Sequence, residues 1–434
     1  MFGYYLDLAL RSLKRSPILT ALMVLAIGLG IGASMTMITV LHVMTADPLP
    51  GKSGTLFYPQ IDPQDMDGYT RDSTPPDQMT WIDAMNLLHA HRGTRQVAMT
   101  GGQVTVRSPQ GKARAFYADA RYASADFFAM FDVPFFRGQG WTAADDEKQA
   151  RVAVISRELA DKLYGADHAL GQELRLGKDS FRVIGVINHW DPVPHFYDLT
   201  QGDYARTEQV FLPLETAMEL KQSTQGSMMC WGSGPPSGDL RKAASCIWMQ
   251  FWVQLDTPAA ITAYRSFLVH YSQEQKALGR FQRPPNIGLH DLMGWLDVNH
   301  VVPGSVQLQA LLALGFMLVC LVNTVALLLV KFLRRGGELS VRRAMGASRR
   351  AVFAQLLIEA SIIGVTGGIV GLSLADAGLW LVRQQPVQYA ALAHLDLPML
   401  ATTVLLALIA TVLAAVFPAW RACHLPPARA LKIQ

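Results

Sequence analysis

Four long apolar segments alternate with polar stretches along the chain. They cover residues 17–44, 305–333, 352–382 and 398–420. A helix that crosses a bilayer needs about 20 mainly apolar residues, because the hydrocarbon core is about 30 Å thick. All four segments reach that length, and the first contains no Asp, Glu, Lys or Arg. We therefore predict four transmembrane helices over these ranges.

The first apolar segment has a competing interpretation as a cleaved signal peptide, because Arg11, Lys14 and Arg15 precede it. The apolar core of a signal peptide covers about 7–15 residues and ends at a cleavage site with small residues. This segment is longer, and no convincing A-x-A site ends it. We therefore expect a span that is not removed.

Residues 1–16 show the spacing of an amphipathic helix. Apolar side chains at positions 2, 5, 6, 9, 10 and 13 share one helical face, and the charged residues lie elsewhere around the helix. The pattern predicts a helix on the cytoplasmic membrane surface, ended by Pro17, because proline interrupts the hydrogen bonds of a helix. A plain cytoplasmic extension of the first span is the alternative.

Basic residues near the span ends predict the orientation, because short cytoplasmic loops carry an excess of Lys and Arg. The link 334–351 contains six Arg residues against one Glu, and the tail 421–434 contains three basic residues. The link 383–397 has one Arg and one Asp. We therefore expect both termini and the link 334–351 in the cytoplasm. Residues 45–304 and 383–397 would then be periplasmic, in a multi-pass protein of a bacterial inner membrane.

Residues 45–304 have the composition of a soluble domain, although the whole chain is 50% hydrophobic and only 17% charged. Turn residues separate segments 104–108 and 113–121, and segments 173–177 and 181–187, which predicts two β-hairpins. Short helical patterns alternate with these strands. We predict a large α+β domain, with antiparallel sheet and two subdomains, inserted between the first and second transmembrane helices.

Two serines in this domain precede predicted helices. Ser124 comes before a short helix through Phe131, and Ser156 before one that ends at Gly165. A serine hydroxyl at such a position accepts a hydrogen bond from a free backbone amide at the start of the helix. Residues 247–255 are typical of a strand and residues 258–278 of a long helix.

Segment 223–245 of the same domain is rich in Gly, Ser and Pro. Cys230 lies within this segment, and Cys246 follows it directly. In an oxidising periplasm the two would form a disulfide that closes a short loop. Two unpaired thiols, one of them buried, are the alternative.

The sequence gives little indication of catalytic or metal-binding residues. We found no G-x-S-x-G, H-E-x-x-H or C-x-x-C motif. Three groups of potential ligands have no standard metal-site spacing, namely Asp145–Glu147, His189 with Asp191 and His195, and Met228–Cys230. A solvated acidic loop and ordinary packing explain them better, because methionine more often serves packing than metal binding. We expect neither a catalytic residue nor a bound metal.

The link between the second and third spans contains a short predicted helix with its own start and end signals. Gly336 and Gly337 follow the second span, and Glu338 and Arg342 stand at i, i+4 in the favourable order. Gly346 ends this predicted helix, and Ser348 is placed to cap the next one. A short basic helix between two spans suits docking to a soluble partner. An anchor that only sets orientation is the alternative, but it leaves the glycine punctuation unexplained.

This link also carries a family resemblance. The sequence ELSVRRAMGA, residues 338–347, resembles the E-x-x-x-R-R-A-L/M-G-A signature of MacB/FtsX-type ABC transporter permeases, with Met345 where Leu is usual. Residues 355–360 and 417–432 resemble the family's following segment and ending. Residues 127–141, 151–165 and 171–187 resemble its periplasmic core. The segment 223–245 has no counterpart there and is interpreted as an insertion.

The resemblance implies partners and a function. It implies a cytoplasmic ABC ATPase that contacts Glu338, Arg342, Arg343 and Gly346, a second permease copy, identical or related, and a periplasmic adaptor with an outer-membrane channel. No P-loop motif occurs in the sequence, so ATP and Mg²⁺ would be bound by a separate ATPase and no cofactor by this chain. We expect efflux of periplasmic substrates and no nucleic-acid partner. Release of lipoproteins, as by LolC/LolE-type permeases, and FtsX-like regulation of a cell-wall hydrolase are the alternatives.

Glycines in the spans indicate close helix contacts. Gly28 and Gly32, Gly364 and Gly368, and Gly367 and Gly371 each lie four residues apart, a spacing that lets helix backbones approach each other in lipid. Chance in glycine-rich spans is the alternative. The spans also contain few ionisable groups, only Glu359 and Asp376 within the third, and both lie toward its ends. Together these features favour mechanotransmission by a dimer over a polar path through the spans.

Overall fold

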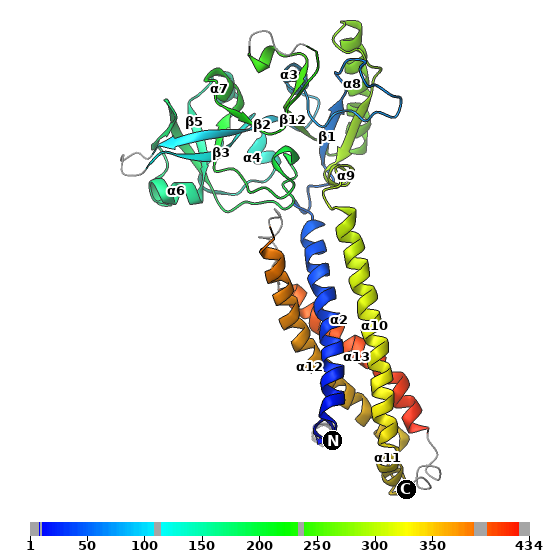
Figure 1. Ribbon diagram of the computed structural model, residues 1–434. Helices are drawn as coiled ribbons and strands as arrows, with labels where there is room; N and C mark the ends of the chain where they lie inside the picture. The colour runs from blue at the N-terminus through cyan, green and yellow to red at the C-terminus, as the bar shows by residue number, and fades with distance from the viewer. Residues whose placement is uncertain (1–7, 9–10, 108–113, 233–237, 386–396, 425–434) are drawn as a thin grey trace. The chain divides into compact units, whose positions relative to one another are not determined.

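The computed structural model describes residues 8, 11–107, 114–232, 238–385 and 397–424 (Figure 1). Its elements group into two compact units. We call residues 1–45 and 302–434 the helical unit, and residues 46–301 the globular unit. The globular unit is thus inserted in sequence between the first and second long helices, as the hydrophobic pattern predicts.

The helical unit contains four described helices that are long and apolar enough to cross a membrane. Each covers its predicted apolar segment, and a short helix follows the second of them. The bounds are α2 Pro17–Met44, α10 Gly304–Arg334, α11 Gly336–Ala344, α12 Arg349–Arg383 and α13 Leu397–Cys423. The predicted range 334–351 therefore contains the last residue of α10, all of α11 and the start of α12. The predicted helix over residues 1–16 lies mostly outside the described residues.

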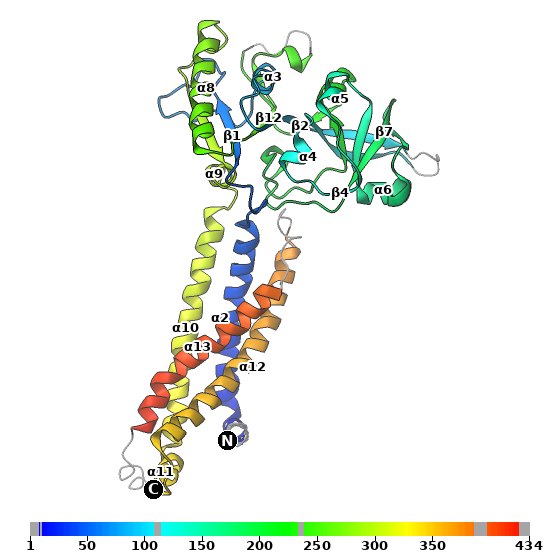
Figure 2. The same ribbon diagram turned by 180° about the vertical axis from the view of Figure 1, so that it is seen from behind.

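Helix α2 is central to the helical unit, because it packs against both α10 and α12. Helix α13 packs against α12 and α10, and Figure 2 shows it crossing between them. The apolar core of this unit includes Met23 and Ile27 of α2, Leu328 of α10 and Leu356 of α12. Many other Leu and Val side chains on these helices are exposed, as expected for surfaces that face lipid.

The globular unit is built on one 11-stranded sheet in the order β13-β1-β12-β2-β3-β8-β5-β7-β4, with β6 paired to β2 and β7, and β9 paired to β2. Its strands are β1 Leu56–Ile61, β2 Arg95–Arg107, β3 Phe116–Ala123, β4 Phe135–Gly138, β5 Val152–Ser156, β6 Glu173–Leu176, β7 Asp179–Ile187, β8 Val210–Pro213, β9 Thr224–Gln225, β12 Gln250–Gln254 and β13 Ile287–Asp291. A separate pair consists of β10 Met229–Cys230 and β11 Cys246–Ile247.

Short helices and one long helix complete this unit. They are α3 Trp81–His89, α4 Phe127–Met130, α5 Ala143–Glu147, α6 Arg157–Leu163, α7 Leu214–Glu219, α8 Pro258–Ala277 and α9 Leu292–Val298, with 3-10 turns η1 Ala166–His168, η2 Leu199–Gln201 and η3 Leu240–Lys242. Their apolar faces pack on the sheet, where Leu159 of α6 and Leu214 of α7 join Val104 and Phe251 in one buried core.

The predicted α+β class is confirmed, and so are both hairpins, β2–β3 and β6–β7. The sheet is mainly antiparallel, but β3–β8 and β5–β7 pair in parallel. Residues 46–301 group as one unit, and the two subdomains expected within it stay a prediction. The predicted strand over 247–255 is interrupted, because the amides of Trp248 and Met249 both donate to the Met79 carbonyl instead of continuing the sheet.

One of the two predicted serine caps is correct. The Ser156 hydroxyl accepts from the Leu159 amide at the start of α6. Ser124 does not cap α4, whose N-cap position is Asp126. The Ser124 hydroxyl instead accepts from the Ala98 amide of β2, because Ser124 directly follows β3, which pairs with β2.

A buried ion cluster lies in the core of the globular unit. Arg121 of β3 is fully buried and donates to Asp198 at 2.7 Å through Nη1 and to Glu208 at 2.9 Å through Nε. The second Glu208 oxygen accepts from the Tyr197 hydroxyl at 2.8 Å. Burial raises the pKa of Asp198, but the Arg121 charge and the hydrogen bonds from Thr200 and Arg121 act together with His195 to hold that pKa below its usual value. The cluster fixes the segment 198–208 against β3.

Replacing Arg121 by Met should destabilise the globular unit strongly. The change leaves two buried carboxylates without a cation, and breaking one partner of a buried ion pair costs about 3–5 kcal/mol. Arg137→Met is the matched control, since Arg137 and its partner Asp167 are 50% and 61% exposed and such pairs contribute about 0–1 kcal/mol. Denaturant unfolding of the detergent-solubilised chain, followed by near-UV circular dichroism, measures both losses. Equal losses for the two variants would contradict the role of the cluster.

Candidate docking site at helix α11

Helix α11 is a discrete element with defined ends. Only Arg335 separates it from α10. At its other end the Gly346 and Ala347 amides donate to the Arg343 and Arg342 carbonyls, and Gly346 has a φ of +100°, which favours glycine. The Ser348 hydroxyl then accepts from the Ala351 amide and caps α12. Gly346 and Ser348 therefore have the predicted local roles, whereas Gly336 and Gly337 lie inside α11 and the break after α10 falls at Arg335.

The charged side chains assigned to partner contact make bonds within the chain. Glu338 accepts from Arg335 at 3.2 Å and lies 3.5 Å from Arg342. Arg342 also donates to the Gln355 side chain of α12 at 3.0 Å. Arg343 donates to the Cys423 carbonyl at the end of α13 at 3.1 Å. These three residues therefore hold α11 against the neighbouring helices while remaining partly exposed.

The exposed face of α11 is apolar. Val341 is 45% and Met345 76% exposed, and Ala344 lies between them on the same face. On the opposite face Leu339 is buried in the core of the helical unit. Exposed arginines at 349 and 350 begin α12, which four residues separate from the end of this helix. The arrangement offers a small apolar surface beside positive charge, which is typical of a contact with another protein.

A buried carboxylate lies next to the start of α11 and holds that end of the helix in place. Glu359 of α12 is fully buried, and its oxygens lie 2.8 Å from Lys331 of α10 and 2.8 Å from Arg335. Ser12, close to the start of the chain, donates to the same carboxylate at 2.5 Å. An unpaired charge in this setting would cost several kcal/mol, and the two cations offset that cost. The cluster joins α10, α12, the residue before α11, and the segment before α2.

Sequence analysis did not identify this cluster. It counted Arg335 among the arginines that predict orientation and noted Glu359 only as an ionisable group near the end of a span. The available signal was the carboxylate itself, because a charge within an apolar segment requires a partner. Lys331 and Arg335 stand at i, i+4, which places two cations on one side of the chain where α10 ends.

The six glycines singled out for helix packing all lie at helix contacts. A Cβ added at Gly32 would lie 2.7 Å from Leu374 of α12, and one at Gly28 would lie 2.8 Å from Val370. A Cβ at Gly371 would meet Ile31 of α2 at 2.9 Å. Gly364 and Gly368 of α12 face α13, where a Cβ added at Gly364 would meet Thr411 and one added at Gly368 would meet Ala407 at 3.0 Å. Side chains at these positions would push the helices apart.

Four of the remaining candidate residues, two cysteines, one aspartate and one histidine, have structural partners. Cys230 and Cys246, the pair expected from the sequence, are joined by a disulfide that links β10 and β11. Residues 233–237 of the segment between them lie outside the described residues. Asp191 accepts from the Thr207 amide, and His195 contacts the Asp198 carbonyl through Nδ1. These groups stabilise the loop around the Arg121 cluster.

Glu359→Ala should destabilise the helical unit. It leaves Lys331 buried without its carboxylate, a change that costs about 3–5 kcal/mol for a buried pair. Asp376→Asn in the same helix is the matched control, because Asp376 is exposed and substitutions at such sites change stability by about 0.5 kcal/mol or less. Thermal unfolding in detergent micelles measures both variants. A Glu359→Ala variant as stable as Asp376→Asn would contradict the supporting role of the cluster.

Comparisons with known proteins agree with this architecture. Residues 20–268 match the family model described as the MacB-like periplasmic core domain, and residues 310–427 match the FtsX-like permease C-terminal model. The pyoverdine export ATP-binding/permease protein PvdT of Pseudomonas entomophila is 26% identical over 76% of this chain and 45% of its own length. The macrolide export ATP-binding/permease protein MacB of Rhodopirellula baltica is 24% identical over 66% of this chain and 41% of its own length. The chain thus spans about half the length of these curated relatives.

A solved structure is also similar to the globular unit. The periplasmic region of MacB from Actinobacillus actinomycetemcomitans aligns over 59% of this chain and 97% of its own length, with 14% identity and a TM-score of 0.36. The family assignment rests on the sequence models, of which the first covers more than half of the chain and the second covers most of α10 and all of α11, α12 and α13. The chain is therefore a permease of the MacB/FtsX-type family of ABC transporters.

Proposed function

We propose that this permease works by mechanotransmission in export. ATP binding and hydrolysis on a separate ABC ATPase would move α11, and the helical unit would pass that movement to the globular unit. The single observation that carries the proposal is the placement of α11, an exposed apolar face on a helix that a buried ion cluster ties to α10, α12 and the chain start. A force applied to α11 therefore acts on several helices together.

The path of the movement follows from the packing of the helices. α11 continues from α10 with one residue between them, and α10 follows the globular unit in sequence. α2, which precedes the globular unit, is packed closely on α12 through Gly28 and Gly32. Close-packed helices move as bodies because protein interiors do not deform continuously. The chain enters the globular unit from α2 and leaves it into α10. The glycine contacts hold α2, and the ion cluster holds α10.

The contact with the ATPase is assigned to the exposed residues of α11. Val341, Ala344 and Met345 would enter an apolar groove of the ATPase, and the arginines at 349 and 350 would face acidic groups at its rim. Glu338, Arg342 and Arg343, which sequence analysis placed in the contact itself, would orient the helix, since each bonds within the chain. Gly346 would end the helix so that this face stays accessible.

The remaining parts of the proposal concern orientation and partners. The excess of arginine around α11 supports a cytoplasmic location for the link and both termini, with the globular unit in the periplasm. The small helix number supports a dimer of permeases. The family resemblance supports export of periplasmic substrates through an adaptor and an outer-membrane channel, and the names of the relatives, which export pyoverdine and macrolides, favour export over lipoprotein release or hydrolase control.

Val341→Asp combined with Met345→Asp should abolish coupling without unfolding the chain. Two buried charges in an apolar contact should weaken binding of the cognate ATPase about 100-fold or more, because central apolar contacts contribute at least about 2 kcal/mol. Co-purification of the ATPase and an export assay measure the loss, and the melting temperature should stay at the wild-type value. The control Val341→Ala with Met345→Leu keeps the surface apolar and should retain binding.

A second double variant distinguishes residues that contact the ATPase from residues that hold α11 in place. Arg342→Glu with Arg343→Glu should weaken ATPase binding and also lower the melting temperature, because both guanidinium groups hold α11 to the bundle. Wild-type ATPase affinity and export in the Val341→Asp, Met345→Asp variant would overturn the docking assignment.

A further inference from the structure

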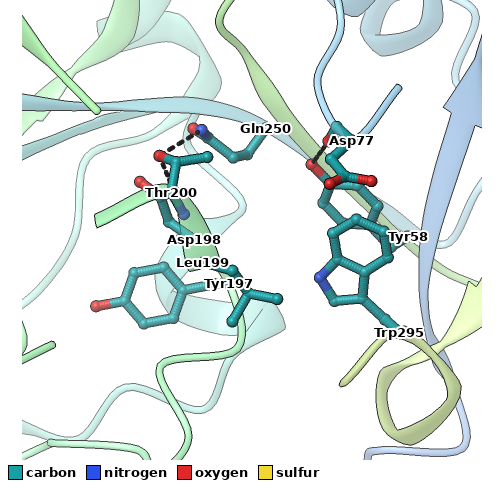
Figure 3. Close-up of a pocket in the computed structure, with 8 residues that line it drawn as sticks. All are labelled: Tyr58, Asp77, Tyr197, Asp198, Leu199, Thr200, Gln250 and Trp295. Carbon is teal, nitrogen blue, oxygen red and sulfur yellow. Dashed lines mark hydrogen bonds between the residues drawn. The ribbon is translucent and has the colours of Figure 1, made fainter. Parts of the chain in front are cut away.

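The globular unit contains a cavity of about 90 Å³ beside the Arg121 cluster (Figure 3). Tyr58 of β1, Gln250 of β12 and Trp295 of α9 contribute walls, and the turn around η2 contributes Asp198 and Thr200. Tyr58, Asp198, Gln250 and Trp295 are buried. Asp77, from the loop before α3, is the exposed member of the lining and marks the opening.

The polar groups of this cavity present acceptors, because their hydrogens are used elsewhere. The Tyr58 hydroxyl donates to the Asp77 backbone carbonyl, and the Thr200 hydroxyl donates to Asp198 Oδ1 at 2.6 Å. The Thr200 oxygen can therefore only accept from Gln250, whose Nε2 lies 3.5 Å away. This contact orients the amide of Gln250 and leaves its Oε1 without a partner among the described residues, although Gln250 is 2% exposed. An unsatisfied buried acceptor is costly and calls for a donor.

The charge around the cavity is negative. Arg121 faces two carboxylates, Asp198 and Glu208, so that cluster keeps one negative charge. Burial lowers the pKa of His195, which therefore adds no positive charge at neutral pH. The Asp77 carboxylate adds a second negative charge at the opening, and one of its oxygens accepts from Gln60 at 3.1 Å. A cation is the ligand that this field favours.

Aromatic rings complete the walls. The Tyr58 and Trp295 rings are stacked, with centroids 3.8 Å apart. Stacking covers the facing surfaces of these rings, and the Tyr58 ring also makes an edge contact with Trp252 at 5.1 Å, so the rings form an apolar wall. The volume suits a head group of a few heavy atoms, since pockets for drug-sized ligands occupy about 300–1,000 Å³.

We propose that this cavity binds a primary ammonium group carried on a short alkyl chain. The three N–H donors of the ammonium group match the Asp77 carboxylate, the free Gln250 Oε1 and the lone pairs of the Thr200 and Tyr58 hydroxyls, and the alkyl part contacts the aromatic rings. The inference assigns a ligand-binding site to the globular unit and does not depend on the proposed function, because the site lies entirely within residues 46–301.

The test is a calorimetric titration of the full chain in lipid nanodiscs with n-propylammonium. Binding should saturate and be at least about tenfold tighter than for 1-propanol, which has no charge, or for propyltrimethylammonium, which has the charge but no N–H donors. Equal affinity for the trimethylated compound would overturn the proposal, because it would show that positive charge without N–H donors accounts for the binding. Absence of saturable binding of n-propylammonium would overturn it as well.

Variants locate the site. Asp77→Asn and Gln250→Leu should each weaken n-propylammonium binding about tenfold, because each removes an acceptor for a charged donor. Asp119→Asn is the matched control, since Asp119 is an exposed carboxylate of β3 outside the cavity, and it should bind as the wild type does. Unchanged binding in Asp77→Asn would overturn the assignment. Asp77 is exposed and its substitution keeps the side-chain shape, so this variant decides the question even if Gln250→Leu does not fold.

Discussion

The Glu359 carboxylate has no access to solvent, and this constraint organises the end of the helical unit that carries α11. A buried carboxylate persists only with nearby cations and donors. Here they come from three separate parts of the chain, Lys331 in α10, Arg335 before α11 and Ser12 before α2. Satisfying one charge therefore requires that α10, α12 and the chain start converge at one point. Helix α11 begins at that point, and its direction follows from it.

The glycine contacts extend this arrangement along the helices. The missing side chains of Gly28 and Gly32 allow α2 to lie against α12, and those of Gly364 and Gly368 allow α13 to lie on the same helix. Apolar attraction between helices is weak in lipid, so close packing and buried polar contacts hold such a bundle together. The ion cluster and the glycine contacts therefore act together on α12, which makes α12 the common support of α2, α11 and α13.

Sequence analysis succeeded where the signal is local. The spans follow from runs of about 20 apolar residues, the two hairpins from turn residues, and the ends of α11 from Gly346 and Ser348. It failed where the structure depends on distant partners. Ser12 and Glu359 are 347 residues apart, and Arg121 meets Asp198 and Glu208 from another part of the sheet. Ser124 shows the same limit, since a strand amide competes for the hydroxyl that the local pattern assigned to a helix. The exposed apolar face of α11 was missed because its charged residues dominate the pattern.

The central claim is that an ATP cycle at α11 moves the globular unit relative to the helical unit. Spin labels at Tyr117→Cys in the globular unit and Trp380→Cys in α12 report this directly, because both native side chains are exposed, with Cys320 and Cys423 replaced by Ala. Double electron–electron resonance on the chain reconstituted with its ATPase gives the distance distribution between the labels. The account predicts distinct distributions in the nucleotide-free and ATP-bound states. An unchanged distribution, while the ATPase bound to the chain hydrolyses ATP, would contradict it.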